Sequence, residues 1–350
     1  MIAFIIKRIL LAAFTLLVIS YISFVMVQLP PGDLVDQYMN TVFDVETAMQ
    51  APRMQVDVQA LRALWRLDRP LFVQWADWMW DIISRGDFGT TLIEYSNSGG
   101  VGTGDIRTLI GERLPFTIYL SVVTIIITWT FAIPVGIYSA VRKNSIGDYL
   151  FTFVGFVGLA IPDFLLGLVL MYVFFAYFGH SVGGLFSGDY IIAPWSLGRV
   201  IDMLQHMIIP ALVIGTAGTA GLIRVMRNNL LDELQKPYVV TARAKGLPYW
   251  KVVARYPVRV ALNPFISGIG GLLPGLIGAD AIVSIVLSLP TLGPLLLTSV
   301  LQQDGPLAGA FILMYSSLSV IGVLISDLML VVVDPRIKLT GSARGSSETV

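Results

Sequence analysis

The sequence of 350 residues contains no cysteine, only two histidines and few charged side chains. The absence of cysteine excludes disulfides, thiolate metal sites and a cysteine nucleophile. The histidines, His180 and His206, match no metal-ligand spacing, so we expect no metal site. Charged residues make up 13% of the chain, whereas soluble domains carry about 25%. Together with a hydrophobic content of 55%, this deficit indicates a protein whose solvent is lipid.

Recognisable catalytic and nucleotide-binding motifs are also missing. The sequence has no H-E-x-x-H, no G-x-S-x-G and no Gly-Lys pair, which a P-loop requires. The glycine-rich segment SNSGGVGTGDI at 96–106 is therefore interpreted as a flexible connection and not as a phosphate cradle. A formal net charge of zero gives no reason to expect a nucleic-acid partner. We expect the chain to bind no cofactor and to hydrolyse no ATP by itself.

Six apolar stretches are long enough to cross a membrane, which takes about 20 residues. They are Ile9–Gln28, Leu114–Val141, Tyr149–Phe178, Met207–Val225, Pro264–Leu289 and Leu307–Val333. The fourth is interrupted by Pro210 and several glycines. No small-residue cleavage site follows the first, so it is interpreted as a retained span and not as a signal peptide. The sequence predicts an all-α integral membrane protein with six transmembrane helices.

The distribution of Lys and Arg predicts the orientation of these spans. With the N-terminus inside, the inner segments hold fifteen basic residues, and the outer segments hold eight. Seven of the eight lie in the long first outer loop, which is discounted because long loops translocate regardless of charge. The sequence therefore predicts that both termini are cytoplasmic, in a multi-pass protein of the cell (inner) membrane.

The long outer loop, 30–113, shows helical periodicity in VQALRALWRLDRPLFVQWADWMWDII. This pattern predicts two amphipathic helices divided near Pro70. Trp75, Trp78 and Trp80 lie on the second of them. They are expected to sit at the lipid headgroups or to pack within the protein, with a ligand-stacking surface as the alternative.

A basic stretch between the fourth and fifth spans, YVVTARAKGLPYWKVVARYPVRVALNPF, holds five basic residues and no acid. Tyr238–Lys245 favours a helix, and Gly246 suits its C-terminus because glycine tolerates the left-handed conformation. Pro248 suits the first turn of a following helix. The predicted structure is a short helix, a sharp break and a second helix. Charge alone would equally permit a simple anchor at the lipid headgroups.

This stretch resembles the cytoplasmic coupling loop of binding-protein-dependent ABC importer permeases. The similarity is to the dipeptide/oligopeptide/nickel subfamily, which has a T-A-R-A-K-G-L core. It extends over nearly the whole chain, in FIIKRILLAAFTLLVISYISFVMVQLPPGD, RLDRPLFVQWADWMWDIISRGDFGTTL, ERLPFTIYLSVV, AIPDFLLG, LPTLGPLL and DPRIKL, in that order. Several ordered motifs at the family's spacing make the resemblance specific.

The resemblance implies two homologous permease subunits, two cytoplasmic ATPase subunits that bind ATP and Mg, and an extracytoplasmic solute-binding protein. A short helix of each permease docks into a groove of an ATPase. Here the coupling element would be Thr241, Ala242, Arg243, Ala244, Lys245, Gly246, Leu247 and Pro248. The implied domains are an N-terminal transmembrane helix (1–29), an extracytoplasmic loop (30–113), a five-helix core with its coupling loop at 232–262 (114–335), and a cytoplasmic tail (336–350).

The sequence departs from the family pattern at three places. Val240-Thr241-Ala242 replaces the general E-A-A signature, a loss that the subfamily shares. Ser284 stands where the subfamily often has a glutamate, while an acid occurs at Asp280. The outer loop between Tyr38 and Gln59 also differs, so binding-protein docking there is unassigned.

Acidic residues within or near the spans are candidates for the translocation pathway, because a charge at the bilayer centre costs at least about 2.5 kcal/mol. Asp280 lies among small residues, where it lines a pathway or makes a helix–helix hydrogen bond. Asp163 follows Pro162 in a broken helix, whose ends can face substrate. Ser284 joins them as a pathway candidate, whereas Asp327 is expected to be structural.

The sequence thus favours a permease subunit for small peptides, in contact with membrane lipid. Oligosaccharides, nickel or opines are alternative substrates within the same family. A membrane scaffold of the same topology and an intramembrane enzyme are alternatives of other classes. Neighbouring reading frames that encode ATPases and a binding protein would distinguish a permease from a scaffold.

Overall fold

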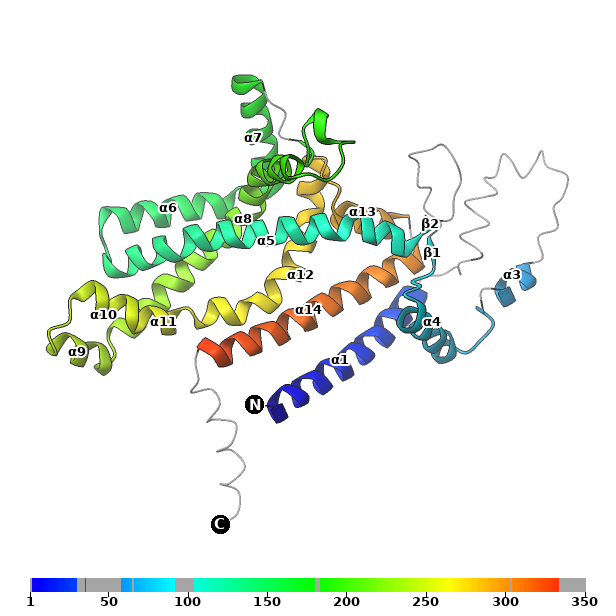
Figure 1. Cartoon of the computed structure of the whole chain (residues 1–350), viewed down its shortest axis with the longest axis horizontal. Helices are drawn as coiled ribbons and strands as arrows, with labels where there is room; N and C mark the ends of the chain where they lie inside the picture. The colour runs from blue at the N-terminus through cyan, green and yellow to red at the C-terminus, as the bar shows by residue number, and fades with distance from the viewer. Residues whose placement is uncertain are drawn as a thin grey trace, which may run out of the picture. The chain divides into compact units, whose positions relative to one another are not determined.

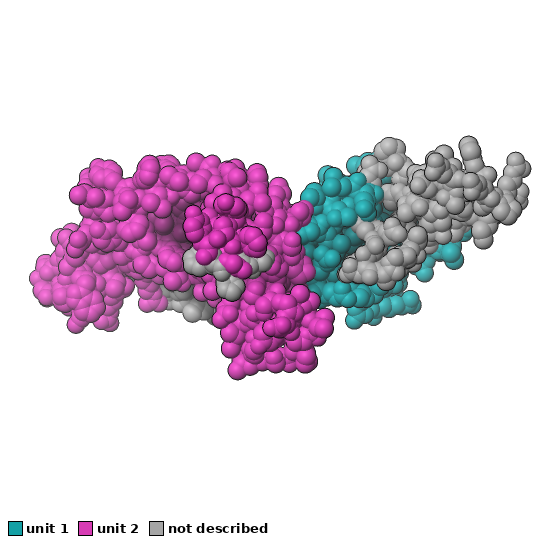
Figure 2. Space-filling model, turned by 90° about the horizontal axis from the view of Figure 1, so that it is seen from above, with its two compact units in different colours: residues 1–115, 291–320 teal, residues 116–290, 321–350 magenta. Residues whose placement is uncertain are grey.

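The computed structural model describes residues 2–29, 35, 58–64, 66–91, 104–179, 183–302 and 304–333. Within these ranges the chain is almost entirely helical (Figure 1). It divides into two compact units, one of residues 1–115 and 291–320 and the other of residues 116–290 and 321–350 (Figure 2). The helices α5 (Ile106–Val141) and α14 (Gly305–Val333) contribute residues to both units. The tail predicted at 336–350 and most of the connection at 96–106 lie outside the described residues.

The first unit is built on α1 and α4. It contains α1 (Ile2–Gln28), α3 (Val58–Leu64), α4 (Leu71–Arg85), α13 (Leu292–Leu301) and a short antiparallel pair, β1 (Thr90–Thr91) with β2 (Gly104–Asp105). The helix α4 begins directly after Pro70 and ends at Gly86, whose φ of 67° is left-handed. The two amphipathic helices predicted on either side of Pro70 are therefore confirmed as α3 and α4.

Two of the three tryptophans of α4 pack against α1. The Trp75 ring lies 5.4 Å from Tyr21, and its indole N–H donates to Ser20 Oγ at 3.2 Å. The Trp78 ring lies 5.6 Å from that of Phe24. These contacts confirm the packing alternative for Trp75 and Trp78. Trp80 is 68% exposed, and its place at the headgroups stays a prediction.

The second unit is organised around α8 (Leu197–Leu234). Its other elements are α6 (Ile146–Ala160), α7 (Asp163–Phe178), η1 (Gly188–Tyr190), α9 (Pro237–Ala244), α10 (Tyr249–Arg255), α11 (Pro257–Ala261) and α12 (Asn263–Val286). One buried cluster joins α8 to α5 and α12 through Leu120, Met207 and Val283. A second joins the other end of α8 to α5, α11 and α12 through Met226, Ala261 and Phe265. Burial of apolar faces on both sides makes α8 the central helix of this unit.

Four described helices have the length and apolar composition of membrane spans. They are Ile6–Gln28, Ile106–Val141, Leu197–Leu234 and Gly305–Leu330. A fifth is counted if the bent pair α6 and α7 forms one span. The fifth predicted span falls on α12, whose side chains at 270–280 are not described. The fold is therefore an all-α membrane fold, and the number of six spans stays a prediction.

The prediction that Pro210 interrupts the fourth span is wrong. α8 continues through Pro210 without a break for 38 residues. A proline removes one backbone hydrogen bond and clashes with the preceding turn. Such sites persist in membrane helices because neighbouring groups satisfy the freed carbonyl. Here Pro210 is buried beside Ala211 and Val213, so tertiary packing outweighs the local helix-breaking tendency.

The third predicted span is divided, as expected from Pro162. α6 ends at Ala160, and α7 begins at Asp163 at an angle of 100° to it. Ile161 is extended, with φ −88° and ψ 123°, which is the conformation that a following proline imposes. The break therefore places the N-terminus of α7, at Asp163, between two apolar helical segments.

Candidate functional site

The basic stretch forms a compact helical hairpin, α9–turn–α10, at the end of α8. Only Gln235 and Lys236 separate α8 from α9, which has Pro237 at its first position. The hydroxyl of Tyr238 donates to the Glu233 carboxylate and so connects α9 back to α8. The position of the hairpin is therefore set by a long helix whose other face lies in the core (Figure 1).

Gly246 ends α9 as predicted. Its φ is +75°, and its N–H donates to the Arg243 carbonyl at 2.9 Å. Lys245 N–H donates to the Thr241 carbonyl at 3.1 Å and caps the last turn. A Cβ added at Gly246 would meet no atom within 4 Å. The need for glycine thus comes from the backbone conformation alone and not from a lack of space.

Pro248 starts the second helix from the residue before it, not from within the first turn. Its φ of −59° and ψ of 137° place it immediately ahead of α10. The Pro248 carbonyl accepts from Lys251 N–H at 2.9 Å and from Val252 N–H at 3.1 Å. The ring fixes the entry angle without losing a helical hydrogen bond, because the first N–H groups of a helix have no internal partner.

A small core holds the hairpin closed. Val239 and Ala242 of α9 pack with Val252 of α10, and all three are buried. Across the turn, the Arg243 guanidinium lies 4.5 Å from the centroid of the Tyr249 ring. These contacts make the two short helices one body, although neither is long enough to be stable in water alone.

The outer surface of the hairpin combines apolar and basic side chains. Val240 is 62% exposed and Trp250 is 68% exposed, and Leu247 lies between them in the turn. Arg243 and Lys245 are exposed on the same hairpin, as are Thr241 and Ala244. Large exposed apolar side chains rimmed by charge are typical of a protein interface. The aromatic contribution of Tyr249 and Trp250 was not predicted, although two aromatics directly after a proline were the available signal.

The three predicted pathway residues lie on two helices of the second unit. Asp163 is the first residue of α7, one turn before Gly167 on the same face. A Cβ at Gly167 would lie 3.7 Å from Val213 and 3.8 Å from Leu287, so this face is directed at α8 and α12. Ser284 is buried on α12. Asp280 is in the same helix, and its side chain lies outside the described part.

Two other polar residues singled out in the sequence, His206 and Asp327, lie on α8 and α14. His206 Nδ1 lies 2.9 Å from the Asp202 carbonyl oxygen, one turn earlier on α8. Asp327 is half-buried on α14. Next to it, the Ser326 hydroxyl donates to the Ile266 carbonyl at 2.6 Å. Within the described residues, no three His, Cys, Asp or Glu side chains are grouped as metal ligands. His180 lies outside those residues.

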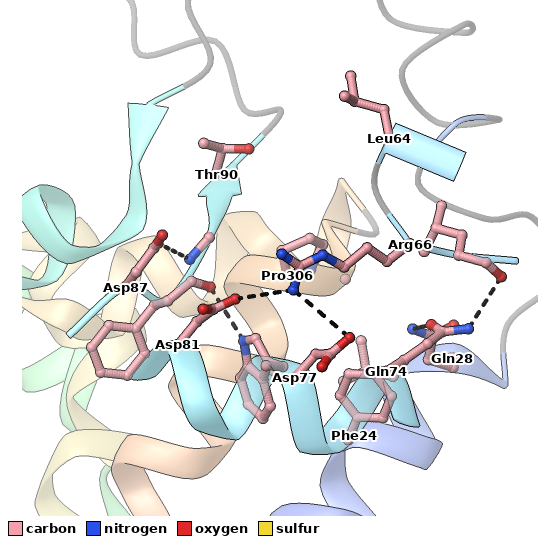
Figure 3. Close-up of a pocket in the computed structure, with 17 residues that line it drawn as sticks. Phe24, Gln28, Leu64, Arg66, Gln74, Asp77, Asp81, Asp87, Thr90 and Pro306 are labelled. Carbon is pink, nitrogen blue, oxygen red and sulfur yellow. Dashed lines mark hydrogen bonds and ion pairs between the residues drawn. The ribbon is translucent and has the colours of Figure 1, made fainter. Parts of the chain in front are cut away.

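A recess of about 460 Å³ lies in the first unit, between α1, α4 and the start of α14 (Figure 3). The Arg66 guanidinium reaches into it and lies 3.7 Å from the carboxylates of both Asp77 and Asp81. Arg69 pairs with Asp77 at 2.6 Å. Arg66 is thus accompanied in the lining by three carboxylates, those of Asp77, Asp81 and Asp87, so the recess combines a charged rim with apolar walls.

These features define a mostly helical, multi-pass membrane protein with an exposed helical hairpin at the end of α8. Comparison with known proteins identifies the family. Residues 132–339 match the family described as binding-protein-dependent transport system inner membrane component, and residues 1–121 match its N-terminal family. The chain belongs to this family of permeases of binding-protein-dependent transporters, whose members work with an ATPase and a solute-binding protein.

Relatives of the chain align with it over nearly its full length. It is 35% identical over 340 residues to the oligopeptide transport system permease protein AppB of Bacillus subtilis, covering 97% of this chain and 100% of the relative. It is 28% identical to the dipeptide transport system permease protein DppB of Lactococcus lactis, with the same coverage. It is 29% identical to the glutathione transport system permease protein GsiC of Salmonella typhimurium, covering 97% and 99%.

Proposed function

We propose that this chain is the transmembrane permease subunit of an ATP-driven importer and forms half of the translocation pathway for small peptides. The substrate class is supported by the names of the relatives, which refer to oligopeptides, dipeptides and glutathione. An extracytoplasmic binding protein delivers the peptide, and a second homologous permease completes the pathway. Oligosaccharides, nickel or opines are the alternative cargo for the same machinery.

The observation that carries this proposal is the α9–α10 hairpin. Its exposed Val240, Leu247 and Trp250 dock into a groove of a cytoplasmic ATPase, and Arg243 and Lys245 add charge complementarity. The hairpin is one body with α8 through Tyr238 and Glu233. Closure of the two ATPases on ATP and Mg is thereby transmitted to the helices around the pathway. This chain contributes no group to ATP hydrolysis.

The proposed orientation places both termini and the hairpin in the cytoplasm. It is supported by the fifteen inner basic residues against a single one in the short outer loops. The α1–α4 unit and its recess then face the binding protein. In this orientation Asp163, Asp280 and Ser284 belong to the two helices proposed to line the pathway.

Site-directed photocrosslinking tests the docking surface. Because the chain has no cysteine, Leu247→Cys creates a unique thiol for a benzophenone maleimide. In the assembled transporter, labelled Leu247→Cys should crosslink to the ATPase. The matched control, Ile22→Cys on the exposed face of α1, should crosslink to lipid or to no protein. Equal ATPase crosslinking from both positions, or none from Leu247→Cys in a complex shown to be assembled, would reject the assignment.

The substrate and the scaffold alternative need a separate measurement. Calorimetry of the cognate binding protein with di- and tripeptides should give heats that oligosaccharides do not. Uptake of the same peptide by vesicles containing the whole transporter should then require ATP. Binding of oligosaccharides alone would replace the substrate class, and an assembled complex that moves none of these solutes would favour a scaffold.

A further inference from the structure

A cleft of about 240 Å³ runs along the contact between α6 and α8 in the second unit. Its walls come from one face of each helix. Polar residues gather at the end near the start of α6, where Asp148, Arg227 and Asn228 lie. Apolar residues, Leu159 and Ala220, lie toward the other end. The cleft therefore has a polar head and an apolar tail along the helix axes.

Close packing marks the apolar end of the cleft. A Cβ at Gly155 would lie 3.5 Å from the Ala220 Cβ, and one at Gly158 would lie 2.9 Å from the Thr216 methyl group. Glycine at these positions lets the two helices approach closely. Beyond Phe156, the lining residues are Leu159 and Ala220, so the environment at this end suits a hydrocarbon chain.

The charges along the cleft do not cancel. Asp148 is 2% exposed and accepts from Arg227 Nε and Nη2, both at 2.9 Å, which forms a bidentate pair. This pair leaves the second arginine of the cleft, Arg224, with its positive charge. In the part of the chain that the structure describes, Arg224 has no carboxylate partner. Its guanidinium instead lies 4.5 Å from the centroid of the Phe156 ring.

The outward side of this cleft is apolar. Tyr149, Phe153 and Val154 of α6 are all more than half exposed. Such a surface on a predicted span is suited to lipid. Arg224 lies in the last third of α8, toward the hairpin, which is the cytoplasmic side in the proposed orientation. Basic pockets between helices on that side bind anionic headgroups.

We propose that the α6–α8 cleft binds one anionic phospholipid, with the phosphate on Arg224 and an acyl chain along Gly155 and Leu159. The volume agrees with this occupant, because about 240 Å³ is below the roughly 300–1,000 Å³ of sites that enclose a whole small molecule. A lipid places only its headgroup and the start of one chain in such a cleft. The proposal uses the orientation proposed above and is independent of ATPase docking.

Native mass spectrometry of the full chain provides the test. The purified protein is released from nanodiscs that contain phosphatidylglycerol and phosphatidylcholine with the same acyl chains. The wild type should retain one phosphatidylglycerol in preference to phosphatidylcholine. Arg224→Gln should reduce that preference about fivefold, the effect of one basic side chain at an anionic surface. Arg259→Gln, which removes an exposed charge from α11 outside the cleft, should leave it unchanged.

A second variant addresses the shape of the site. Thr152→Trp fills the cleft and keeps both arginines, so it should also release the lipid. Thermal unfolding shows that each variant is folded before its lipid is measured. An equal loss in Arg259→Gln would mean general surface charge, and no preference in the wild type would mean no site. Displacement of the lipid by inorganic phosphate would indicate a pocket for a free anion. Each of these outcomes overturns the proposal, whatever the crosslinking of Leu247→Cys shows.

Discussion

The proposed coupling of the transporter depends on the backbone conformation of one residue, Gly246. Its φ of +75° directs the chain from α9 into α10, and no side chain lies where a Cβ would point. A substitution there therefore tests conformation without a steric clash. Residues that tolerate the left-handed region should preserve the hairpin, and β-branched residues should not.

We expect Gly246→Val to uncouple peptide uptake from ATP hydrolysis while the protein still inserts. The left-handed conformation costs about 1–2 kcal/mol for a residue with a Cβ. α9 would then end elsewhere, and Val240 and Leu247 would turn relative to the ATPase. Uptake and substrate-stimulated ATP hydrolysis in reconstituted vesicles measure the effect.

The matched control is Gly246→Asn, because asparagine is the next most frequent residue in this conformation. It should retain most of the coupling. Wild-type coupling in Gly246→Val would show that the break is not part of the coupling element. An equal loss in both variants would show that the side chain itself, and not the backbone angle, obstructs docking.

The tryptophans of α4 allow a second comparison at this scale. Trp75→Ala removes the ring contact with Tyr21 and the hydrogen bond to Ser20. It should cost about 3 kcal/mol, the low end of the usual range because Trp75 is only partly buried. Trp80→Ala removes an exposed ring and should change stability by about 0.5 kcal/mol or less. Thermal unfolding of the two purified variants should rank them in that order. A larger effect from Trp80→Ala would mean that its ring, not that of Trp75, holds the first unit.

At the scale of elements, one buried ion pair joins α6 to α8. Asp148 also accepts from Asn144 N–H at 2.9 Å, so its carboxylate holds the loop before α6 as well as Arg227. Removing one partner of such a pair strands the other charge. The loss of stability on removing one partner is therefore larger than the modest net contribution of the intact pair.

We expect Asp148→Ala to lower the free energy of unfolding by about 3 kcal/mol, the low end of the usual range because Arg227 keeps 24% exposure. The double variant Asp148→Leu with Arg227→Met should be more stable than Asp148→Ala alone, since no charge is stranded. Thermal unfolding in one detergent compares them. A double variant that unfolds below Asp148→Ala would contradict a role based on charge pairing.

The elements that the sequence predicted best carry their own local signals. Gly246 and Pro248 predict the hairpin, because glycine permits the left-handed turn and proline favours a new helix start. Pro162 predicts the break between α6 and α7, because a proline restricts the residue before it. Pro210 misled the prediction, since its effect depends on buried neighbours that no local pattern shows. The Asp148–Arg227 pair was missed for a related reason. Its members are 79 residues apart, and only the packing of α6 on α8 brings them together.

The candidate site shows the same division. The turn between α9 and α10 was predicted from turn chemistry, whereas the coupling role of 241–248 comes from the family resemblance and stays a prediction. The exposed surface of the hairpin was not predicted. The sequence alone does not show that Val239 and Val252 face each other and leave Val240 and Trp250 exposed. The strand pair of Thr90 and Thr91 with Gly104 and Asp105 was missed as well, because strands of two residues have no periodicity to detect.

At the scale of the whole molecule, the charge distribution predicts that both termini and the hairpin lie in the cytoplasm. Reporter fusions after Lys143, Arg259 and Val350 should give cytoplasmic signals. A fusion after Gly188 should give an extracytoplasmic one, because it precedes the only basic residue of the short outer loops, Arg199. An extracytoplasmic signal at Arg259 or Val350 would reject this topology and, with it, the docking of the hairpin on an ATPase.

The length of α8 gives the molecule a lever. Its 38 residues extend about 57 Å, whereas the hydrocarbon core of a bilayer is about 30 Å thick. With the predicted span at Met207–Val225, residues 226–234 extend about 14 Å beyond its cytoplasmic end, and this end moves by about 0.2 Å for each degree of tilt. Because the hairpin follows α8 after two residues, a tilt of about 10° would move it by about 2 Å relative to the proposed ATPase. The length of α8 beyond the membrane therefore determines how far the hairpin moves for a given tilt of the helix.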